Sequence, residues 1–517
     1  MSAWKRTVVG LCLLLGCSAH ADTFYVSTTG ADANAGTSPG QAWRHLAYAA
    51  QQVAPGDTVY IERGDYGNET LAITIDGTPS APISFIGYQF VPGDRPGPAF
   101  QYGEALDPAV MPLLDGGDRS SGTGITLYSR SYVIVKNIQI RNYEAGVDGW
   151  HGRHLTLENI IVSDTGDINA SYSGNGITLG GADDNTLRGC IVVNAAAEGY
   201  TVVGDRNHLE SCRVYADDNS TIPSSTDYYI IVEGNDNTFD NCYAERVGDL
   251  EHVGHGIGIK GNGQNNTFSN CTGKNLAGAF YVRHRGARNN TFLNCTAIEG
   301  TGLLVRDGAS DNTFINCHTI NAENAVTFLD TDEDGGAQFA GRNNIFVGCT
   351  FENTTNTGIN FSYYSLESSA DNNSFVNCVF AGGPYLFRTE RTNANNTLIN
   401  CIVSGFGNLS IGSYALDYST SSSIFWNCGF PLPPGAGVMA ADPMFVDPNA
   451  GDFRLLSGSP GIDAGDNSAV PPGVGVDPDG RTRFIDDPCT VDSGLGSAPI
   501  VDIGAYEFLL GGTCPGD

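Results

Sequence analysis

Charged side chains recur at one position of successive short apolar runs in the middle of the chain. The runs end as Ile231-Val232-Glu233, Gly258-Ile259-Lys260, Tyr281-Val282-Arg283 and Leu304-Val305-Arg306. Side chains alternate across a strand, so the preceding Val or Ile faces inward and the charged residue faces outward. If the runs are neighbouring strands, they predict an exterior stack with about 4.8 Å between rungs. Its members are Glu233, Lys260, Arg283 and Arg306, with glycine (Gly180, Gly204) at the same position of earlier runs.

A row of cations beside a glycine floor suits a polymer of uronic acids. Such polymers are cut by β-elimination: a base takes the proton at C5, a cation neutralises the adjacent carboxylate, and an acid protonates the leaving O4. A lysine can be that base when neighbouring cations disfavour its charged form. Arg283 and Arg306 favour this for Lys260, whereas Glu233 opposes it. The alternative interpretation is a solvated charge ladder without function.

Composition limits the classes of function. The 517 residues carry a net charge of −31, with four lysines against 22 arginines. Nucleic acid is excluded as the main partner, because phosphate contacts need clustered basic residues. No apolar run long enough for a membrane span follows the N-terminus. The expected partner is an anionic polysaccharide, and the expected oligomeric state is a monomer.

Ten cysteines mark a repeat instead of a disulfide framework. Each ends a phrase such as DNTFDNC at Cys242, NNTFSNC at Cys271 or NNTFLNC at Cys295, at spacings of 22 to 32 residues. A period in this range predicts a solenoid, and three short strands per turn leave no room for helices. The sequence therefore predicts an all-β, right-handed parallel β-helix. Asn, Phe and Cys of each phrase should stack on the next turn, with Cys as a small buried apolar residue.

The two ends of the chain differ from this repeat. Residues 1–21 read as a secretory signal with a cleavage site at Ala19-His20-Ala21, and Leu14-Leu15-Gly16-Cys17 is a loose lipobox that leaves lipoprotein anchoring open. We expect a β-helix over 22–430, with a capping helix within 43–53 over its open end, and an Asp/Gly/Pro-rich module over 431–517. The protein is then secreted, periplasmic or on the cell surface. Cys489 and Cys514 are the expected disulfide pair.

The stretch IGIKGNGQNNTFSNCTGKNLAGAFYVRHRGARNNTF resembles the core of the chondroitinase B and alginate lyase family, polysaccharide lyase family six. The resemblance implies that Lys260 is the Brønsted base and that Arg283, in Arg283-His284-Arg285-Gly286, acts as the acid. Arg306, His255, His284 and Tyr281 would then contact the sugar, with Tyr281 a spare acid and Arg388 extending the groove. The phrases DPMFVD, SPGIDAG and DIGAYEF resemble a C-terminal module of exported β-helix proteins that serves surface sorting; a plain C-terminal cap is the alternative.

Two departures bear on this resemblance. The family's acidic calcium ligands precede its Lys, but Val253-Gly254-His255 stand there, so a calcium site of that type is not expected. Gly254-His255-Gly256 also resembles the Gly-His-Gly motif of polygalacturonases (glycoside hydrolase family 28), and Asp227 lies one rung earlier. Hydrolysis needs at least two acting carboxylates, however, and that family's Asp-Asp pair and Asn-Thr-Asp phrase are absent.

One metal motif lies apart from these residues. Asp330-Thr331-Asp332-Glu333-Asp334-Gly335 matches the start of a calcium loop, although the twelfth position is Gly341 and not Glu. Asp330, Asp332 and Asp334 are therefore candidate calcium ligands, with a plain acidic loop as the alternative. No organic cofactor is expected. The sequence favours a polysaccharide lyase, and leaves open a hydrolase acting through Asp227 and His255, or a non-catalytic adhesion protein.

Overall fold

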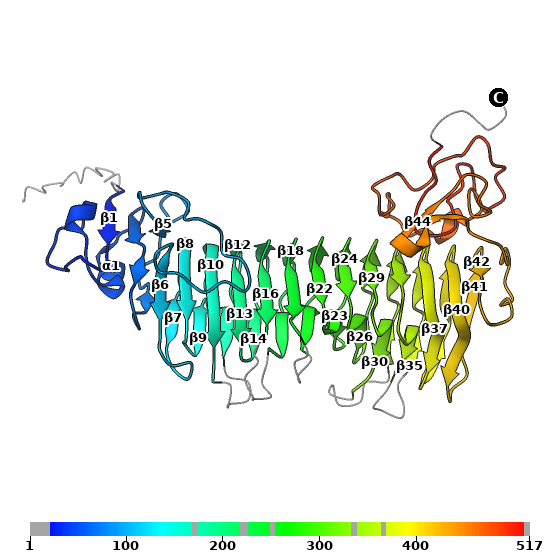
Figure 1. The fold of residues 1–517 in the computed structure, drawn as a ribbon, viewed down its shortest axis with the longest axis horizontal. Coiled ribbons are helices and arrows are strands. Elements are labelled where there is room, and N and C mark those ends of the chain that lie inside the picture. The colour runs from blue at the N-terminus through cyan, green and yellow to red at the C-terminus, as the bar shows by residue number, and fades with distance from the viewer. Residues whose placement is uncertain are drawn as a thin grey trace, which may run out of the picture.

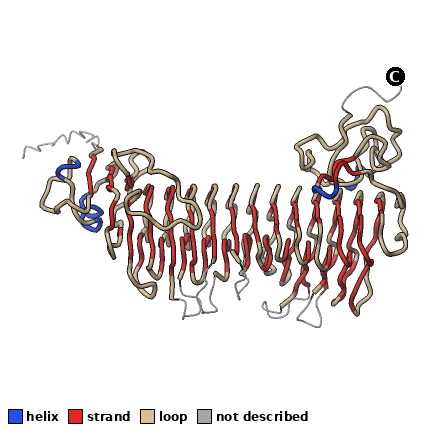
Figure 2. Tube along the Cα trace, in the orientation of Figure 1, coloured by secondary structure: helices blue, strands red, loops and turns tan. Residues whose placement is uncertain are grey.

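The computed structural model describes residues 21–167, 174–217, 226–248, 254–331, 339–362 and 369–510. All of the expected leader except Ala21 lies outside these residues, as do Asp332, Asp334 and Cys514. The chain winds as a parallel β-helix with its strands stacked along one axis (Figures 1 and 2). No helix in the described part of the chain is long and apolar enough to cross a membrane.

Three parallel stacks of strands form the walls, and most coils contribute a strand, or part of a long strand, to each stack. The first stack consists of β1 (Thr23–Val26), β2 (Thr58–Glu62), β5 (Ile83–Tyr88), β8 (Val133–Arg141), β10 (Thr156–Thr165), β12 (Thr186–Arg188), β15 (His208–Glu210), β18 (Thr238–Asp240), β21 (Thr267–Ser269), β24 (Thr291–Leu293), β28 (Thr313–Ile315), β32 (Ile345–Val347), β36 (Ser374–Val376), β39 (Asn396–Ile399) and β41 (Tyr418–Ser421).

The second stack includes the later parts of the long strands β8 and β10. Its other members are β3 (Gly64–Asp65), β6 (Pro112–Asp115), β13 (Ile191–Ala195), β16 (Arg213–Ala216), β19 (Tyr243–Arg246), β22 (Thr272–Lys274), β25 (Thr296–Ile298), β29 (His318–Ile320), β33 (Thr350–Glu352), β37 (Val379–Thr389), β40 (Ile402–Gly412) and β42 (Ile424–Trp426).

The third stack carries the charged column. It contains β4 (Leu71–Ala72), β7 (Thr123–Thr126), β9 (Ala145–Asp148), β11 (Asn175–Leu179), β14 (Glu198–Val202), β17 (Tyr228–Val232), β20 (His255–Ile259), β23 (Ala277–Arg283), β26 (Thr301–Arg306), β30 (Asn324–Leu329), β34 (Thr357–Phe361) and the later part of β37. A small fourth sheet joins β27 (Ala309–Ser310), β31 (Phe339–Arg342), β35 (Ser369–Asp371) and β38 (Thr392–Ala394).

The repeated phrase explains why the coils stack. In NNTFLNC the first Asn, Asn289, and the last, Asn294, adopt positive φ and make the two bends; Asn tolerates this conformation better than most residues. The middle Asn, Asn290, is fully buried, and its Nδ2 donates to Oδ1 of Asn312 on the next coil at 3.0 Å. The same bond recurs at 2.8–3.2 Å from Asn185 to Asn396. The predicted amide ladder is confirmed.

Phenylalanine and cysteine fill the interior beside this ladder, as the repeat predicts. Phe268 and Phe292 stack with ring centroids 4.6 Å apart, and the column continues through Phe314 at 4.8 Å. The ten repeat cysteines are free thiols; nine are buried, and Cys428 is partly exposed. Each buried apolar side chain contributes about 1.5–3 kcal/mol to folding, so the repeat stabilises itself coil by coil.

The two ends are closed differently. Helix α1 (Leu46–Gln52) buries Leu46, Ala49 and Ala50 against the first coil, with Val53 beside them, which confirms the predicted capping helix. The remaining helical segments are single 3₁₀ turns: η1 (Pro39–Gln41), η2 (Pro448–Ala450) and η3 (Asn467–Ala469).

The described part of the C-terminal module lies along the side of the last coils, not over their open end (Figure 1). It contains one antiparallel pair, β43 (Phe445–Asp447) with β44 (Asp452–Leu455). Phe453 and Ile503 pack on Val379 and Ile402 of the second stack. Asn377 donates to the Asp502 carbonyl at 2.7 Å, so an asparagine of a coil bend also holds the module. Cys489 is disulfide-bonded.

Candidate active site

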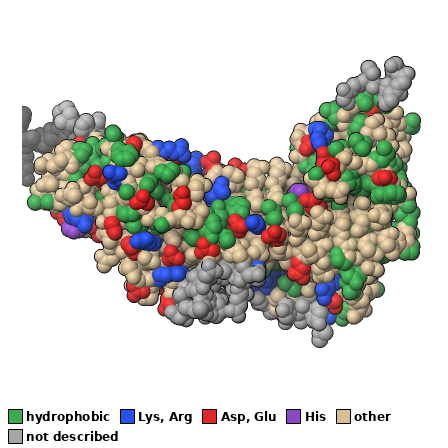
Figure 3. Space-filling model, in the orientation of Figure 1, with side chains coloured by type: hydrophobic (Ala, Val, Ile, Leu, Met, Phe, Trp, Pro, Cys, Tyr) green, Lys and Arg blue, Asp and Glu red, His purple; other side chains and the backbone are tan. Residues whose placement is uncertain are grey.

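The third stack places the four charged residues on successive strands. Val232 pairs with Ile259, and Ile259 with Val282, so Glu233, Lys260 and Arg283 follow one another at the next position. Arg283 pairs directly with Arg306. Several strands of this stack, including β23, β26 and β30, are labelled along the lower part of Figure 1. On the face shown in Figure 3, Lys and Arg are interspersed with Asp and Glu, so charge must be considered residue by residue.

The two arginines are buried, which corrects the prediction that they lie in an exterior stack. Arg283 and Arg306 are only 4 and 5% exposed. Both meet Asp307, which is fully buried: its Oδ2 accepts from Nε of Arg306 at 2.8 Å and from Nε of Arg283 at 3.3 Å. Asp307 and not Glu233 thus offsets the paired cations, and among the described residues Glu233 makes no ion pair.

A second layer of bonds fixes Asp307 in its charged form. Its Oδ1 accepts from the Thr331 backbone N–H at 2.6 Å and from the Thr331 hydroxyl at 2.8 Å. Burial alone raises the pKa of Asp307, but the charge of Arg306 and the bonds from Thr331 outweigh it, so the pKa lies below its ordinary value. Burial in turn lowers the pKa of Arg306. The three charges form one rigid unit beneath the surface.

Lys260 differs from its neighbours in the column. Its side chain is partly exposed, and among the described residues it makes no ion pair. Its Nζ lies over the ring of Tyr228, 4.7 Å from the centroid. The hydroxyl of Tyr228 accepts a short hydrogen bond from Nη1 of Arg283. Burial raises the pKa of Tyr228 to about 12, against the opposing charge of Arg283, so Tyr228 keeps its proton at neutral pH.

His255 is held as a neutral imidazole. The carbonyl oxygen of Ala277 can only accept, so Nδ1 of His255 donates to it at 3.0 Å. Nε2 then carries the lone pair and faces Nη1 of Arg306 at 3.4 Å. Burial and the charge of Arg306 lower the pKa of His255 to about 4. His255 therefore positions Arg306 and adds no charge near neutral pH.

Tyr281 does not reach the surface, which corrects its expected role as a sugar contact or spare acid. The side chain is fully buried, and its hydroxyl donates to the Ile230 carbonyl at 3.2 Å. Its ring lies 5.7 Å from that of Tyr228 and 5.5 Å from that of His255. Tyr281 packs with Ile231 and Leu304 in a small apolar cluster. Tyr281 therefore supports the rings of Tyr228 and His255.

A carboxylate that was not singled out from the sequence lies near Lys260. Glu198 begins β14 and pairs in register with Tyr228. It accepts a short bond from the Thr201 hydroxyl. Burial raises the pKa of Glu198, Thr201 and Lys260 oppose the rise, and the charges of Glu233 and Asp227 add to it. Glu198 is therefore the carboxyl of this site most suited to hold a proton.

The two remaining residues that the sequence predicts to contact the substrate are His284 and Arg388. His284 is partly exposed at the turn after β23, with φ of 78°, and its Nδ1 accepts from the Gly261 N–H at 3.2 Å. Arg388 lies further along the stack, and the pairings that run back from it lead to Tyr281 and not to Arg306. Its Nε donates to Glu390 at 3.2 Å. The structure does not bring Arg388 to the cluster.

The expected glycine floor is also different. Leu179 pairs with Val202, and Val202 with Val232, so Val203 and not Gly204 precedes Glu233 in the column. Gly180 does occupy the position before it, but the ring of Trp150 covers Gly180: a Cβ there would meet Trp150 Cδ2 at 2.2 Å. The two rungs before Glu233 therefore present a valine and a glycine covered by an aromatic ring instead of an open glycine surface.

The predicted calcium ligands are described only in part. Asp330 is fully buried directly after β30, next to the Thr331 that holds Asp307. Asp332 and Asp334 lie outside the described residues. A calcium site of the family-six type does not fit this chain, because the position five residues before Lys260 is His255, whose Nδ1 is committed to Ala277. Calcium at the Asp330 loop stays a prediction.

Sequence reasoning missed Tyr228, Asp307 and Glu198. Tyr228 lies five residues before Glu233, and His255 lies five residues before Lys260. The alignment of repeats that reveals the charged column therefore also places these two residues at one shared position of neighbouring repeats. Strict alternation points to Tyr229 instead, but Tyr229 and Ile230 both face the core, and Tyr228 faces outward with Ile231.

Two family models match the chain, each over part of its length. The model for the Pel9A-like right-handed β-helix region matches residues 24–171. A general model for the right-handed β-helix region matches residues 255–430. The chain is a right-handed β-helix protein. The handedness predicted from the sequence is thereby confirmed.

Relatives of this β-helix protein are distant. A protein of Bacillus subtilis (strain 168) named "Uncharacterized protein YwoF" is 27% identical over 202 residues, which cover 36% of this chain and 41% of that protein. The match thus spans less than half the length of that relative.

Solved structures with a similar fold include polysaccharide lyases. The family six lyase Pedsa3628 from Pseudopedobacter saltans is 12% identical, covering 80% of this chain and 95% of its own, with a TM-score of 0.43. Pectate lyase Pel9A is also 12% identical, covering 94% and 96%, with a TM-score of 0.35. Glycoside hydrolases occur among the similar structures as well. These likenesses concern the fold.

Proposed function

We propose that this β-helix protein is an exported polysaccharide lyase that cleaves a polymer containing uronic acid by β-elimination. One observation carries the proposal. Lys260, a partly exposed amine with no ion pair among the described residues, lies on the Tyr228 ring, and Arg283 donates to the Tyr228 hydroxyl. A partly exposed base thus lies against a largely buried proton donor and a largely buried fixed cation, the three groups that β-elimination requires.

Each residue has a defined part in the reaction. The Lys260 amine takes the proton from C5, and the electrons of that C–H bond form the double bond between C4 and C5. The bond from C4 to O4 breaks, and the Tyr228 hydroxyl gives its proton to O4. Arg283 stabilises negative charge on the substrate carboxylate and on the tyrosinate that forms, because a guanidinium stays protonated throughout. The proton on Lys260 then returns to Tyr228 through solvent.

Asp307, His255 and Arg306 act by positioning. Asp307 holds both guanidinium groups in place. The Nε2 lone pair of His255 faces Arg306 without adding charge. Preorganised charges of this kind stabilise a developing negative charge without reorganisation during the reaction. His284 and Glu233 flank Lys260 and are proposed sugar contacts.

Hydrolysis is the second candidate function, and Glu198 favours it. A carboxyl with a raised pKa beside other carboxylates matches the acid of an inverting or retaining glycosidase. Asp227, whose carbonyl accepts from the His255 N–H, would then supply the second carboxylate. This mechanism does not require Lys260.

The product decides between the two. Mature protein is mixed in turn with alginate, pectate and chondroitin or dermatan sulfate, with calcium and with chelator. Ultraviolet absorbance detects the unsaturated sugar that only elimination produces, and a reducing-end assay detects both reactions. The proposal predicts that absorbance and reducing ends rise together on one polymer. Reducing ends without absorbance would identify a hydrolase, and Glu198→Gln would then abolish them. Loss of activity with chelator would support calcium at the Asp330 loop.

A further inference from the structure

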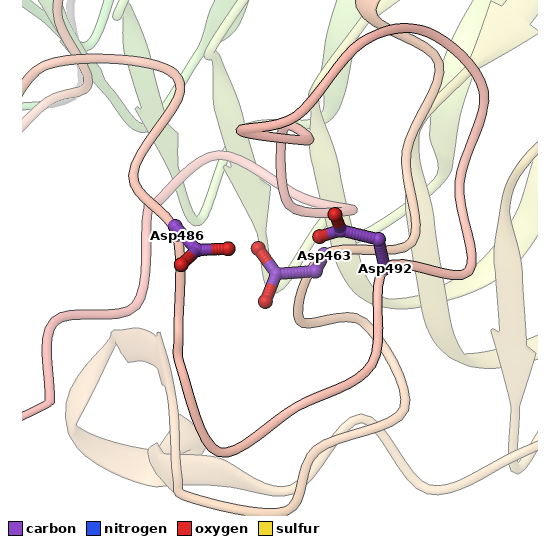
Figure 4. Close-up of side chains that lie close together, drawn as sticks. All are labelled: Asp463, Asp486 and Asp492. Atoms are coloured by element: carbon purple, nitrogen blue, oxygen red, sulfur yellow. The ribbon is translucent and has the colours of Figure 1, made fainter.

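Three carboxylates of the C-terminal module converge on one point. One oxygen from each of Asp463, Asp486 and Asp492 lies within 4.8 Å of the other two. Figure 4 shows Asp463 between the other two, which come from a single loop. This part of the chain is strongly acidic: residues 431–517 contain thirteen Asp and Glu against three Arg. Among the described residues no Lys or Arg pairs with the three carboxylates.

Asp463 provides an independent observation that points to a ligand. The residue is fully buried, and its Oδ1 is a buried atom without a hydrogen-bond partner. The other oxygen, Oδ2, accepts from the Asp487 N–H at 3.2 Å. Buried carboxylate oxygens are normally bonded, because leaving one bare costs on the order of 1–3 kcal/mol. Asp463, which carries this unbonded oxygen, lies between Asp486 and Asp492 (Figure 4).

The surrounding backbone prevents the carboxylates from separating freely. The Asp463 N–H donates to Oδ1 of Asp502 at 2.8 Å, and its carbonyl accepts from Ser493 at 2.9 Å and Gly494 at 3.1 Å. Cys489, midway between Asp486 and Asp492, is disulfide-bonded. Three segments therefore meet at Asp463. Burial, with smaller contributions from the charges of Asp486 and Asp492, raises the pKa of Asp463 to about 6, against the bond from Asp487.

We propose that Asp463, Asp486 and Asp492 bind a calcium ion that fastens the C-terminal module together. The donors are all oxygen, which suits Ca²⁺ or Mg²⁺ and not zinc. Asp463 is buried while Asp486 and Asp492 are exposed, so one side of the ion keeps water ligands. Ca²⁺ accepts such an irregular set of six to eight oxygens, whereas Mg²⁺ requires near-octahedral geometry. This site is separate from the Asp330 loop and does not depend on the proposed enzyme activity.

The site would link three stretches of the module: the turn at Asp463, the loop that carries Asp486 and Asp492, and the segment around Asp502. That segment continues to Ile503, which packs on the side of the coils with Val379 and Ile402. Calcium would therefore strengthen the docking of the module as well as its internal structure.

Calorimetric titration of the mature chain with CaCl₂ tests the proposal. Asp486→Asn and Asp492→Asn are exposed substitutions that should fold normally. Asp447→Asn is the matched control, because Asp447 is exposed in the same module and outside the cluster. We expect a site with a Kd on the order of 10⁻⁴–10⁻³ M, weakened at least about tenfold by either cluster variant and unchanged in the control. Asp330→Asn should retain the site.

Thermal unfolding gives a second readout. With calcium, the cluster variants should melt below the wild type; with chelator they should melt at the same temperature or above it, because each removes a repelling charge. Equal calcium binding and equal melting in wild type and both variants would overturn the proposal. So would a shift that CaCl₂ produces equally in the wild type, both cluster variants and the Asp447→Asn control, since that is a general effect of salt.

Discussion

The interior of the coils and the outward face of the third stack follow opposite rules. Inside, the same residue returns on each coil: Asn290 bonds Asn312 as Asn266 bonds Asn290, and phenylalanine lies on phenylalanine. Outside, the column changes from valine to acid to lysine to arginine over neighbouring strands. Repetition stabilises the solenoid, whereas a catalytic group needs neighbours that differ from it. Function is therefore expected where the repeat is broken.

The largest effect on stability is expected from Asp307, the buried carboxylate beneath the outward face. Asp307→Asn removes the buried carboxylate that accepts from Nε of both Arg283 and Arg306, and breaking a buried ion pair from one side costs on the order of 3–5 kcal/mol. Denaturant unfolding measures the loss. Asp236→Asn, an exposed carboxylate one rung before Lys260, is the control and should change stability little.

The pH dependence of this effect has a definite sign. The folded pKa of Asp307 lies below its ordinary value, so its contribution is present above the unfolded pKa of about 3.9 and is lost as pH falls through the folded value. Wild type and Asp307→Asn should therefore converge in stability in strong acid. A difference that persists there would contradict the assignment of Asp307 as the charged partner.

The regular interior should respond to mutation in stability alone. Asn290→Ala removes two donated and two accepted bonds of the ladder and leaves buried partners unsatisfied. We expect a loss of at least about 2 kcal/mol, measured by denaturant unfolding, and an unchanged kcat where the protein stays folded. Thr291→Ala on the adjoining strand is the milder control. A lower kcat in a fully folded Asn290→Ala protein would mean that the interior ladder also affects the function of the outward face.

Two neighbouring tyrosines allow the proposed catalytic hydroxyl to be distinguished from a structural one. Tyr228→Phe removes the proposed proton donor and should lower kcat at least about tenfold with little change in melting temperature. Tyr281→Phe removes a hydroxyl of the same cluster that donates to the Ile230 carbonyl, and should change kcat less than about twofold. Equal effects of the two variants would refute the proton-donor role.

The smallest effect concerns His255. Its folded pKa of about 4 lies below the unfolded value of about 6.5. Between these values the unfolded chain binds a proton that the folded protein does not, so stability falls as pH drops from 6.5 towards 4. His255→Gln should remove about one bound proton from this dependence, which corresponds to about 2 kcal/mol at pH 5. Parallel pH–stability curves of variant and wild type would contradict a neutral His255.

The fold could be predicted from the sequence because the same residue pattern recurs in successive coils. The positions of Asn, Phe and Cys in the phrase at 289–295 predict an amide ladder and interior columns of Phe and Cys, and the ladder, the stacked Phe rings and the buried Cys side chains are present. The capping helix was predicted for a related reason: Leu46, Ala49 and Ala50 share one side of a helix.

The site was predictable only in its register. That Glu233, Lys260, Arg283 and Arg306 are neighbours follows from aligning the repeats, but their burial does not. Asp307 and Tyr228 lie outside the aligned column, and the direction of Tyr228 depends on two successive inward residues that break the alternation. The alignment of repeats places Gly204 in the column, whereas the structure places Val203 there. A shift of one residue in register changes which side chain faces outward.

The most direct test of the account compares two lysines. Formation of the unsaturated product is followed for wild type, Lys260→Ala and Lys274→Ala on the polymer that the wild type cleaves. Lys274 lies in the second stack and pairs with Glu245 at 2.9 Å, so its loss should leave the rate unchanged. The account predicts that Lys260→Ala lowers the rate at least about 10³-fold at an unchanged melting temperature. A folded Lys260→Ala protein that forms the product at the wild-type rate would contradict it.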